Sequence, residues 1–191
     1  MKLTASGNLP VKIVKELYSE KIITEEFIED GTKKLLKESD SESIQYAKII
    51  GTLSGIFRKS RNHLHVTKSG RRFENQKDNF AKIFNTFGIK FNLGYSDGFE
   101  NDQIAQLGFK YSVYLLKKYG NETRASDFYA EKYFQAFPDI AEGNSEDISC
   151  YYLRTFTRFF NYFGIIEMIG TCRDRKVIKT ALFDKYIEIS V

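Results

Sequence analysis

The stretch GIFRKSRNHLHVTKSGRRF, residues 55–73, decides how the first half of the chain is interpreted. Its short runs of apolar and β-branched residues predict an antiparallel hairpin over residues 56–67, with a turn at residues 59–62. The Thr-Lys-Ser-Gly segment that follows predicts the start of a helix. The stretch also holds six Lys or Arg residues and no Asp or Glu. It therefore predicts a strand pair that carries a local positive charge.

Three helices are expected before this hairpin. The first begins near Leu9, and the second follows Thr24 and carries apolar residues as far as Leu36. The third begins after Ser41 and ends at Gly55. Its apolar residues recur at helical spacing (Ile44, Ala47, Ile50 and Leu53), which places the polar residues Gln45, Lys48 and Thr52 on the outer face.

The second half of the chain repeats this order of elements. Helices are expected over residues 78–91, 101–119, 126–137 and 145–163, and a second hairpin over residues 165–180. Gly-Ile pairs precede both hairpins (residues 55–56 and 164–165), and the second strand of each hairpin ends in a Thr. The phenylalanines of the last helix, among them Phe156, Phe159 and Phe160, recur at helical spacing and are expected in the core.

The predicted fold class is mainly α with short β-hairpins (α+β), built from two similar modules joined by a helix. The expected organisation is an N-terminal module over residues 1–76, a connecting helix and loop over residues 77–100, and a C-terminal module over residues 101–191.

The composition is typical of a globular protein. Apolar residues make up 42% of the 191 residues and charged residues 28%, which excludes a disordered or membrane-spanning chain. No apolar run is long enough for a membrane helix, and the first residues lack the apolar core of a signal peptide. Two Cys residues do not make a disulfide framework. A cytoplasmic location is therefore expected.

The positive charge is concentrated in the first module. Residues 1–76 hold 14 Lys and Arg against 10 Asp and Glu, whereas residues 77–191 hold 15 of each, so the first segment carries the whole net charge of +4. Between Ser43 and Phe73 there are seven cationic residues and no acidic one. A local positive field favours contact with a polyanion, and duplex DNA is the partner expected. A solvated surface without a partner is the alternative.

No catalytic residue, cofactor or metal is expected. His63 and His65 would share one face of a strand, but Cys150 and Cys172 are distant in the sequence and no second ligand pair is evident. The carboxylates of Asp97, Glu100 and Asp102 indicate a turn and a helix cap rather than a cation site. No phosphate-binding loop and no nucleophile motif is present, so the chain is not expected to be an enzyme.

Three helices followed by a hairpin, with LHVTKSGRRFE at residues 64–74, resemble the winged helix-turn-helix superfamily. The segment LTASGNLP at residues 3–10 is also similar to one found in uncharacterised bacterial proteins, some of them encoded on plasmids. The resemblance implies tandem winged-helix-like modules whose third helices and wings contact DNA. It implies a regulator or a plasmid or phage accessory factor.

The resemblance also implies which residues contact nucleic acid. The third helix of the first module is poor in groups that read base edges, so phosphate contact through its wing is favoured. The candidates in the first module are Gln45, Lys48 and Thr52 on the helix and Arg58, Lys59, Arg61, His63, Lys68, Arg71 and Arg72 on and after the wing. The candidates in the second module are Arg154 and Arg158 on the helix and Arg173, Arg175 and Lys176 on the wing.

A protein-interaction scaffold is the rival function. Winged helices also serve as docking modules, and the neutral, Phe- and Tyr-rich second module favours a protein partner there. Arg154 and Arg158 fit this alternative equally well, because Glu146 or Asp147 of a neighbouring turn would pair with them. A second copy of the chain is a further candidate partner.

Overall fold

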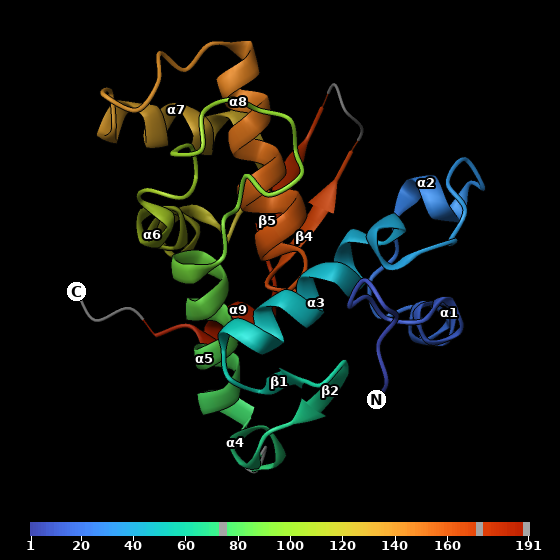
Figure 1. Ribbon diagram of the computed structural model, residues 1–191. Helices are drawn as coiled ribbons and strands as arrows, with labels where there is room; N and C mark the ends of the chain where they lie inside the picture. Colours follow the sequence, from blue (N-terminus) through green and yellow to red (C-terminus); the bar gives the residue numbers. More distant parts are fainter. Residues whose placement is uncertain (73–75, 171–173, 189–191) are drawn as a thin grey trace. The chain divides into compact units, whose positions relative to one another are not determined.

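The computed structural model describes residues 1–72, 76–170 and 174–188 (Figure 1). The chain divides into two compact units, unit 1 at Met1–Thr86 and unit 2 at Phe87–Val191. Helices alternate with two small antiparallel sheets, which is compatible with the α+β class predicted. No helix within the described residues combines the length and the apolar character needed to cross a membrane.

Unit 1 consists of helices followed by a hairpin. Helix α3 leads directly into the hairpin β1–β2 (Figure 1). The elements in chain order are α1 (Val11–Ser19), α2 (Glu26–Glu29), the 3-10 helix η1 (Glu38–Asp40), α3 (Glu42–Leu53), β1 (Phe57–Ser60), β2 (His63–Val66), α4 (Lys68–Arg71) and α5 (Gln76–Lys90), whose last turn belongs to unit 2.

Helix α3 begins at the cap that the sequence predicts. The Ser41 hydroxyl accepts a hydrogen bond from the Ile44 amide at 3.4 Å. The Glu25 carboxylate adds bonds from the Glu42 and Ser43 amides at 3.0 and 3.1 Å, which places a negative charge at the positive end of the helix. This second cap comes from 17 and 18 positions earlier in the chain, which is too far for the local sequence pattern to predict.

Helix α2 is shorter than predicted. It ends at Glu29, and Gly31 follows with φ +79°, a left-handed conformation that interrupts a helix. Apolar residues after this glycine, such as Leu36, therefore do not extend the helix as their spacing predicts.

The buried face of α3 also differs from the predicted one. Ile44 and Ile50 are buried, but Ala47 is exposed and Leu53 is 42% exposed. A Cβ on Gly51 would lie 2.4 Å from the Phe57 ring, so the missing side chain lets Phe57 pack directly on the helix backbone. The hairpin therefore contacts α3 at Gly51, one helical turn after Ala47.

The first hairpin is confirmed. Strands β1 and β2 pair antiparallel with Phe57 opposite Val66 and Ser60 opposite His63. The first residues of the chain run along the free edge of β2, where Leu3 N donates to Asn62 O at 2.9 Å. Apolar residues from this segment, α1, α3 and β2 form the core of unit 1: Leu3, Leu9, Val14, Tyr18, Ile44 and Leu64.

Unit 2 repeats the order of helices and hairpin, with one more strand. Its sheet has the order β3-β5-β4. The elements are α6 (Phe109–Tyr119), β3 (Arg124–Ala125), α7 (Ser126–Ala136), α8 (Ser145–Tyr152), the π-helical segment η2 (Leu153–Phe160) that continues α8, β4 (Ile166–Ile169), β5 (Lys176–Lys179) and α9 (Ala181–Tyr186).

Two predictions for unit 2 need correction, and one is confirmed. The helix expected from residue 101 begins only at Phe109, because Ala105 and Gly108 adopt φ +67° and +70°. Strand β3 was missed, since two residues carry no alternating pattern. The second hairpin is confirmed by the antiparallel pairing of β4 and β5, although residues 171–173 of its turn lie outside the described residues.

The core of unit 2 is largely aromatic. Phe156, Phe159 and Phe160 are each at most 1% exposed, as their spacing predicts. Two buried tyrosines have bonded hydroxyls: Tyr151 donates to Ser112 Oγ at 2.9 Å, and Tyr133 donates to Leu107 O at 2.7 Å. The buried hydroxyl of Tyr129 has no hydrogen-bond partner among the described residues. Burial raises the pKa of Tyr133 to about 12, so this hydroxyl remains a donor at neutral pH.

A threonine closes the corner between the third helix and the hairpin in unit 1. Thr67 N donates to Ile56 O at 2.9 Å, and its Oγ1 donates to Gly55 O at 2.7 Å. Gly55 has φ +75°, which ends α3 and turns the chain into β1.

The same corner occurs in unit 2. Thr180 N donates to Ile165 O at 3.0 Å, and its Oγ1 donates to Gly164 O at 2.7 Å. Gly164 has φ +63°. The short sequence parallels between the two halves therefore correspond to the same local backbone arrangement in both units.

Candidate nucleic-acid interface

Exposed cationic side chains lie on the first hairpin and on the single helical turn that follows it. Arg58 lies opposite His65 in the hairpin, and Ser60 lies opposite His63. Residues that lie opposite each other in paired strands point to the same face, and so do alternate residues of one strand, so all four share one face. Arg58 and His65 are exposed there. The exposed cations of this region are named here the basic surface: Arg58, Lys59, Arg61, Lys68, Arg71 and Arg72.

Within the described residues, no acidic neighbour pairs with the basic surface. Among the described residues, none of its six side chains forms an ion pair. No Asp or Glu occurs in the sequence between residues 43 and 73. Unpaired exposed cations on a defined backbone are suited to contact phosphate groups.

Arg61 stands at the tip of the hairpin in a strained conformation. It and Asn62 form a two-residue turn with φ +45° and +59°, a geometry that matches the twist of a hairpin but is uncommon for arginine. The N-terminal segment stabilises this turn, because Asn62 Nδ2 donates a hydrogen bond to Leu3 O at 3.2 Å. The tip therefore holds Arg61 outward on a supported turn.

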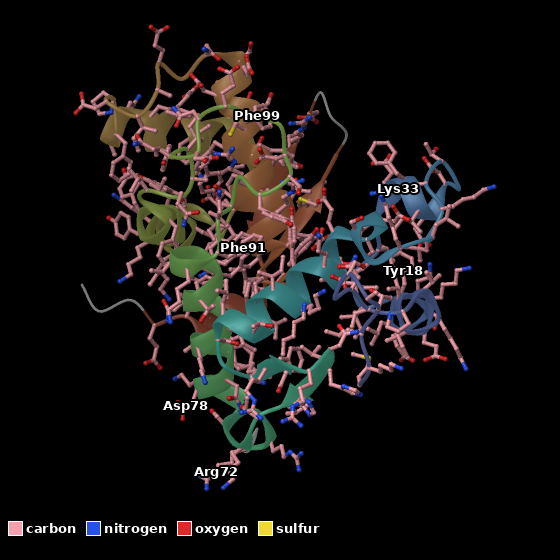
Figure 2. All side chains as sticks on the ribbon, in the orientation of Figure 1. Tyr18, Lys33, Arg72, Asp78, Phe91 and Phe99 are labelled. Atoms are coloured by element: carbon pink, nitrogen blue, oxygen red, sulfur yellow. The ribbon has the colours of Figure 1, made fainter. Side chains whose placement is uncertain are left out.

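Helix α4 positions the remaining cations of the basic surface. Thr67 Oγ1 caps it by accepting from Gly70 N at 2.9 Å. A Cβ on Gly70 would lie 2.4 Å from Ile56 O, so only glycine allows α4 to approach the start of the hairpin this closely. Figure 2 labels Arg72, the C-cap residue directly after α4.

Helix α3 contributes little to this surface. Gln45 is half-buried, and the exposed Thr52 donates its hydroxyl to Lys48 O at 2.8 Å within the helix. Neither side chain adds charge. Gln45 and Thr52 stay candidates for weak contacts with nucleic acid, while the cations of the hairpin and α4 supply the positive charge of this surface.

Lys48 does not face outward as predicted. Its side chain is 17% exposed and forms an ion pair with Glu38, which is 2% exposed. It also donates to Gly7 O at 3.3 Å, and Glu38 accepts a hydrogen bond from Leu9 N at the start of α1. Lys48 therefore connects α3 to the segment before α1, and its charge is compensated within the fold.

The prediction that Arg154 faces DNA is wrong. Its side chain is fully buried and bonds Asp97 with two nitrogens, Nε to Oδ2 at 2.6 Å and Nη2 to Oδ1 at 3.1 Å. Nη1 donates to the carbonyls of Asn101 and Ile104 at 2.6 and 3.1 Å. Burial alone would lower the pKa of Arg154, but the hydrogen bonds to Asp97 and the charges of nearby acidic groups together outweigh it, and the pKa is raised.

Arg158 is removed from the candidates for the same reason. It lies one turn after Arg154, is 5% exposed, and places Nη1 3.6 Å from Asp97 Oδ2. It also donates to Tyr95 O at 3.3 Å. The two arginines and Asp97, named here the buried triad, bind the loop of residues 95–104 to the helix.

The second hairpin offers fewer free cations than the first. Lys176 pairs with Asp174 at 3.0 Å, and the Arg175 guanidinium lies 4.3 Å from the centre of the Tyr152 ring. Arg173 lies outside the described residues. Arg175 and Lys176 therefore remain at the surface, with part of their interactions satisfied within unit 2.

Sequence reasoning missed Asp97 and Glu38 as partners of buried cations. The turn expected at Asp97 is present, because Asp97 Oδ1 accepts from Phe99 N at 3.0 Å, but the carboxylate also pairs with the triad. Glu146 and Asp147, the partners considered for the arginines, are not the partners found. The available signal was the position of Arg154 and Arg158 among core phenylalanines, which requires a buried carboxylate.

No group of three or more His, Cys, Asp or Glu side chains suited to hold a metal is found in the part of the chain that the structure describes. The rings of His63 and His65 lie 5.9 Å apart on the outer face of the hairpin. His63 Nδ1 is 2.9 Å from Arg61 O, which ties this ring to the hairpin tip.

Cys150 is a core residue rather than a surface thiol. It is 1% exposed on α8. Burial raises the pKa of its thiol to about 12, so the reactive thiolate is not populated at neutral pH.

Cys150 is therefore expected to resist alkylation in the native protein. In a Cys172→Ser background, iodoacetamide at about pH 8 should label it only through opening of unit 2, and labelling should become fast in urea. Mass spectrometry of quenched samples follows the modification. Equal labelling rates in buffer and in urea would contradict the buried position.

Comparisons with protein-family models, with curated proteins and with solved structures each found no match to this chain.

Proposed function

We propose that the protein binds duplex DNA, mainly by phosphate contacts from the basic surface of unit 1. The observation that carries the proposal is the set of six exposed cations that have no ion-pair partner among the described residues. Hydrogen bonds fix the elements that carry them: Asn62 bonds the hairpin turn to Leu3, and Thr67 caps α4. Such contacts position a protein on DNA without reading its sequence.

We further propose that both units are winged-helix-like. In unit 2 the order α6, β3, α7, α8 with η2, β4 and β5, with a β3-β5-β4 sheet, supports this. In unit 1 the support is three helices and a hairpin, together with the Thr67 corner that recurs at Thr180. The basic surface then corresponds to a wing and the turn behind it.

Unit 1 is expected to supply most of the DNA affinity. Unit 2 has no excess of positive charge, and its helical arginines pair with Asp97. A regulator or a plasmid or phage accessory factor in the cytoplasm fits this proposal, with the low cysteine content as support for the location.

A triple variant, Arg58→Glu with Lys59→Glu and Arg61→Glu, is expected to weaken DNA binding by roughly 100-fold or more. Reversing three charges replaces attraction of phosphates by repulsion at the hairpin. Fluorescence anisotropy with a random-sequence duplex at about 50 and 200 mM salt measures the loss. For the parent, each phosphate neutralised should contribute about −0.9 to the slope of log affinity against log salt.

The matched control reverses three exposed lysines of unit 2, namely Lys90, Lys110 and Lys185. It changes the net charge by the same amount but should reduce affinity far less. Equal losses in both triple variants would assign the binding to total charge and not to the hairpin.

Protein docking is the second candidate function. Three large apolar side chains of unit 1 are strongly exposed: Ile22 by 86%, Phe27 by 65% and Leu36 by 66%. Exposed apolar groups of this size are typical of contact surfaces. Absence of any duplex binding by the folded parent at about 50 mM salt would favour docking over DNA.

A further inference from the structure

Unit 1 contains a cavity that the DNA proposal does not use. Its volume is about 740 Å³, within the range typical of small-molecule sites. The segment around α1, helix α3 and the inner face of the hairpin form its walls. Most of the lining is aliphatic, and it includes these apolar side chains: Leu17, Ile23, Ile44, Leu64, Val66 and Phe57.

The uncharged polar groups at the cavity are already occupied. The Tyr18 hydroxyl donates to Glu29 Oε1 at 2.9 Å and accepts from Glu25 N at 2.9 Å. The Ser43 hydroxyl donates to Glu25 Oε1 at 2.8 Å. A sugar or a nucleoside placed here would therefore lose hydrogen bonds to water that these uncharged groups do not replace, which is costly.

Basic side chains line the cavity without acidic ones among them. Lys48, His65 and Arg71 line it, and no Asp or Glu does. Lys48 is paired with Glu38. The hairpin register places His65 on the outer face with Arg58. Arg71 is left as an exposed cation beside an apolar space, with no ion-pair partner among the described residues.

We propose that this cavity binds an aliphatic carboxylate, with the chain among the apolar side chains and the carboxylate on Arg71. The guanidinium matches a carboxylate through two parallel hydrogen bonds. Burial of the chain in the aliphatic lining supplies the rest of the affinity. Because binding is measured without DNA, the proposal does not depend on the function of the basic surface.

The test is calorimetric titration of the full chain with three ligands of equal chain length, dodecanoate, dodecanol and dodecylamine. Dodecanoate should bind roughly tenfold or more tightly than dodecanol, because only the carboxylate gains charge-assisted bonds to Arg71. Dodecylamine should bind most weakly, because its ammonium would approach a cation.

Variants locate the site. Arg71→Gln should remove the preference for dodecanoate over dodecanol, whereas Arg72→Gln, a neighbour that does not line the cavity, should keep it. Ala47→Phe should abolish binding of both ligands, because Ala47 is an exposed residue of the cavity wall and a phenyl ring there fills the space. The two arginine variants change surface residues, so they remain decisive even if Ala47→Phe fails to fold.

Three results would overturn the proposal: equal affinities for dodecanoate and dodecanol, unchanged dodecanoate binding by Arg71→Gln, or undiminished binding by a folded Ala47→Phe. A fourth result that would overturn it could come from sedimentation of the protein without ligand. A dimer that Ala47→Phe dissociates would show that a second copy of the chain, not a carboxylate, covers the cavity.

Discussion

Replacing Asp97 with Asn is expected to lower the free energy of unfolding of unit 2 by about 3–5 kcal/mol. Asp97 is the carboxylate that pairs with both Arg154 and Arg158, and its side chain is fully buried. Asn keeps the shape of the side chain but removes the buried carboxylate charge that Arg154 and Arg158 share. Removing one member of a buried charge cluster lowers the stability by more than the intact cluster contributes to it, because the remaining charges stay buried away from water.

Alkylation of Cys150 measures this loss within unit 2. Cys150 is buried on α8, directly before the segment that carries both arginines. If labelling follows opening of the unit, the Asp97→Asn variant should react roughly 10²- to 10⁴-fold faster than the parent. A Cys172→Ser background restricts the signal to this thiol.

An exposed ion pair of the same unit provides the control. Asp174→Asn breaks the ion pair between Asp174, which is 66% exposed, and Lys176, which is 42% exposed. It should lower the free energy of unfolding of unit 2 by less than about 1 kcal/mol. A labelling rate for Asp97→Asn close to that of Asp174→Asn would show that the buried triad does not stabilise unit 2.

Replacing Lys48 with Met is expected to lower the free energy of unfolding of unit 1 by about 3 kcal/mol. Met retains the apolar stem of lysine but leaves the buried Glu38 carboxylate without its cation. Glu38 also accepts the Leu9 amide, so the segment before α1 should loosen together with α3. Hydrogen exchange of the α1 and α3 amides, followed by mass spectrometry, reports on this region.

Two further variants make the test of Lys48 specific. Lys12→Met removes an exposed lysine that lies 3.9 Å from Glu16, and it should leave exchange nearly unchanged. Glu38→Gln combined with Lys48→Met should recover much of the stability, because no buried charge remains and Gln still accepts from Leu9 N. Exchange in Lys48→Met equal to that in Lys12→Met would contradict the structural role of the ion pair.

The stability of Lys48→Met also bears on DNA binding. Lys48 was a candidate for contact with DNA, and any loss of affinity in this variant is expected to follow from a loosened unit 1. Cys150 in unit 2 should label at the parent rate, since the pair with Glu38 lies wholly in unit 1.

The sequence alone determined the elements that depend on neighbouring residues. Both hairpins, the start of α3 at Ser41 and its end before Gly55 follow from alternation, capping and glycine conformation, which act over a few residues. The aromatic spacing of residues 156–160 similarly predicted a buried helix face. The six cations of the basic surface were identified for the same reason, because a segment without acidic residues carries its charge in any fold.

Only the tertiary structure decided which charged groups are buried and with which partner. Arg154 lies 57 positions from Asp97, and Glu25 caps α3 from 16 or more positions away, so no local pattern links these residues. Whether a cation faces solvent depends on what the rest of the chain packs against it. Lys48 and Arg58 both lie in a segment without acidic residues, so the sequence does not distinguish them. In the fold, Glu38 pairs with Lys48 inside unit 1, whereas Arg58 stays exposed on the hairpin.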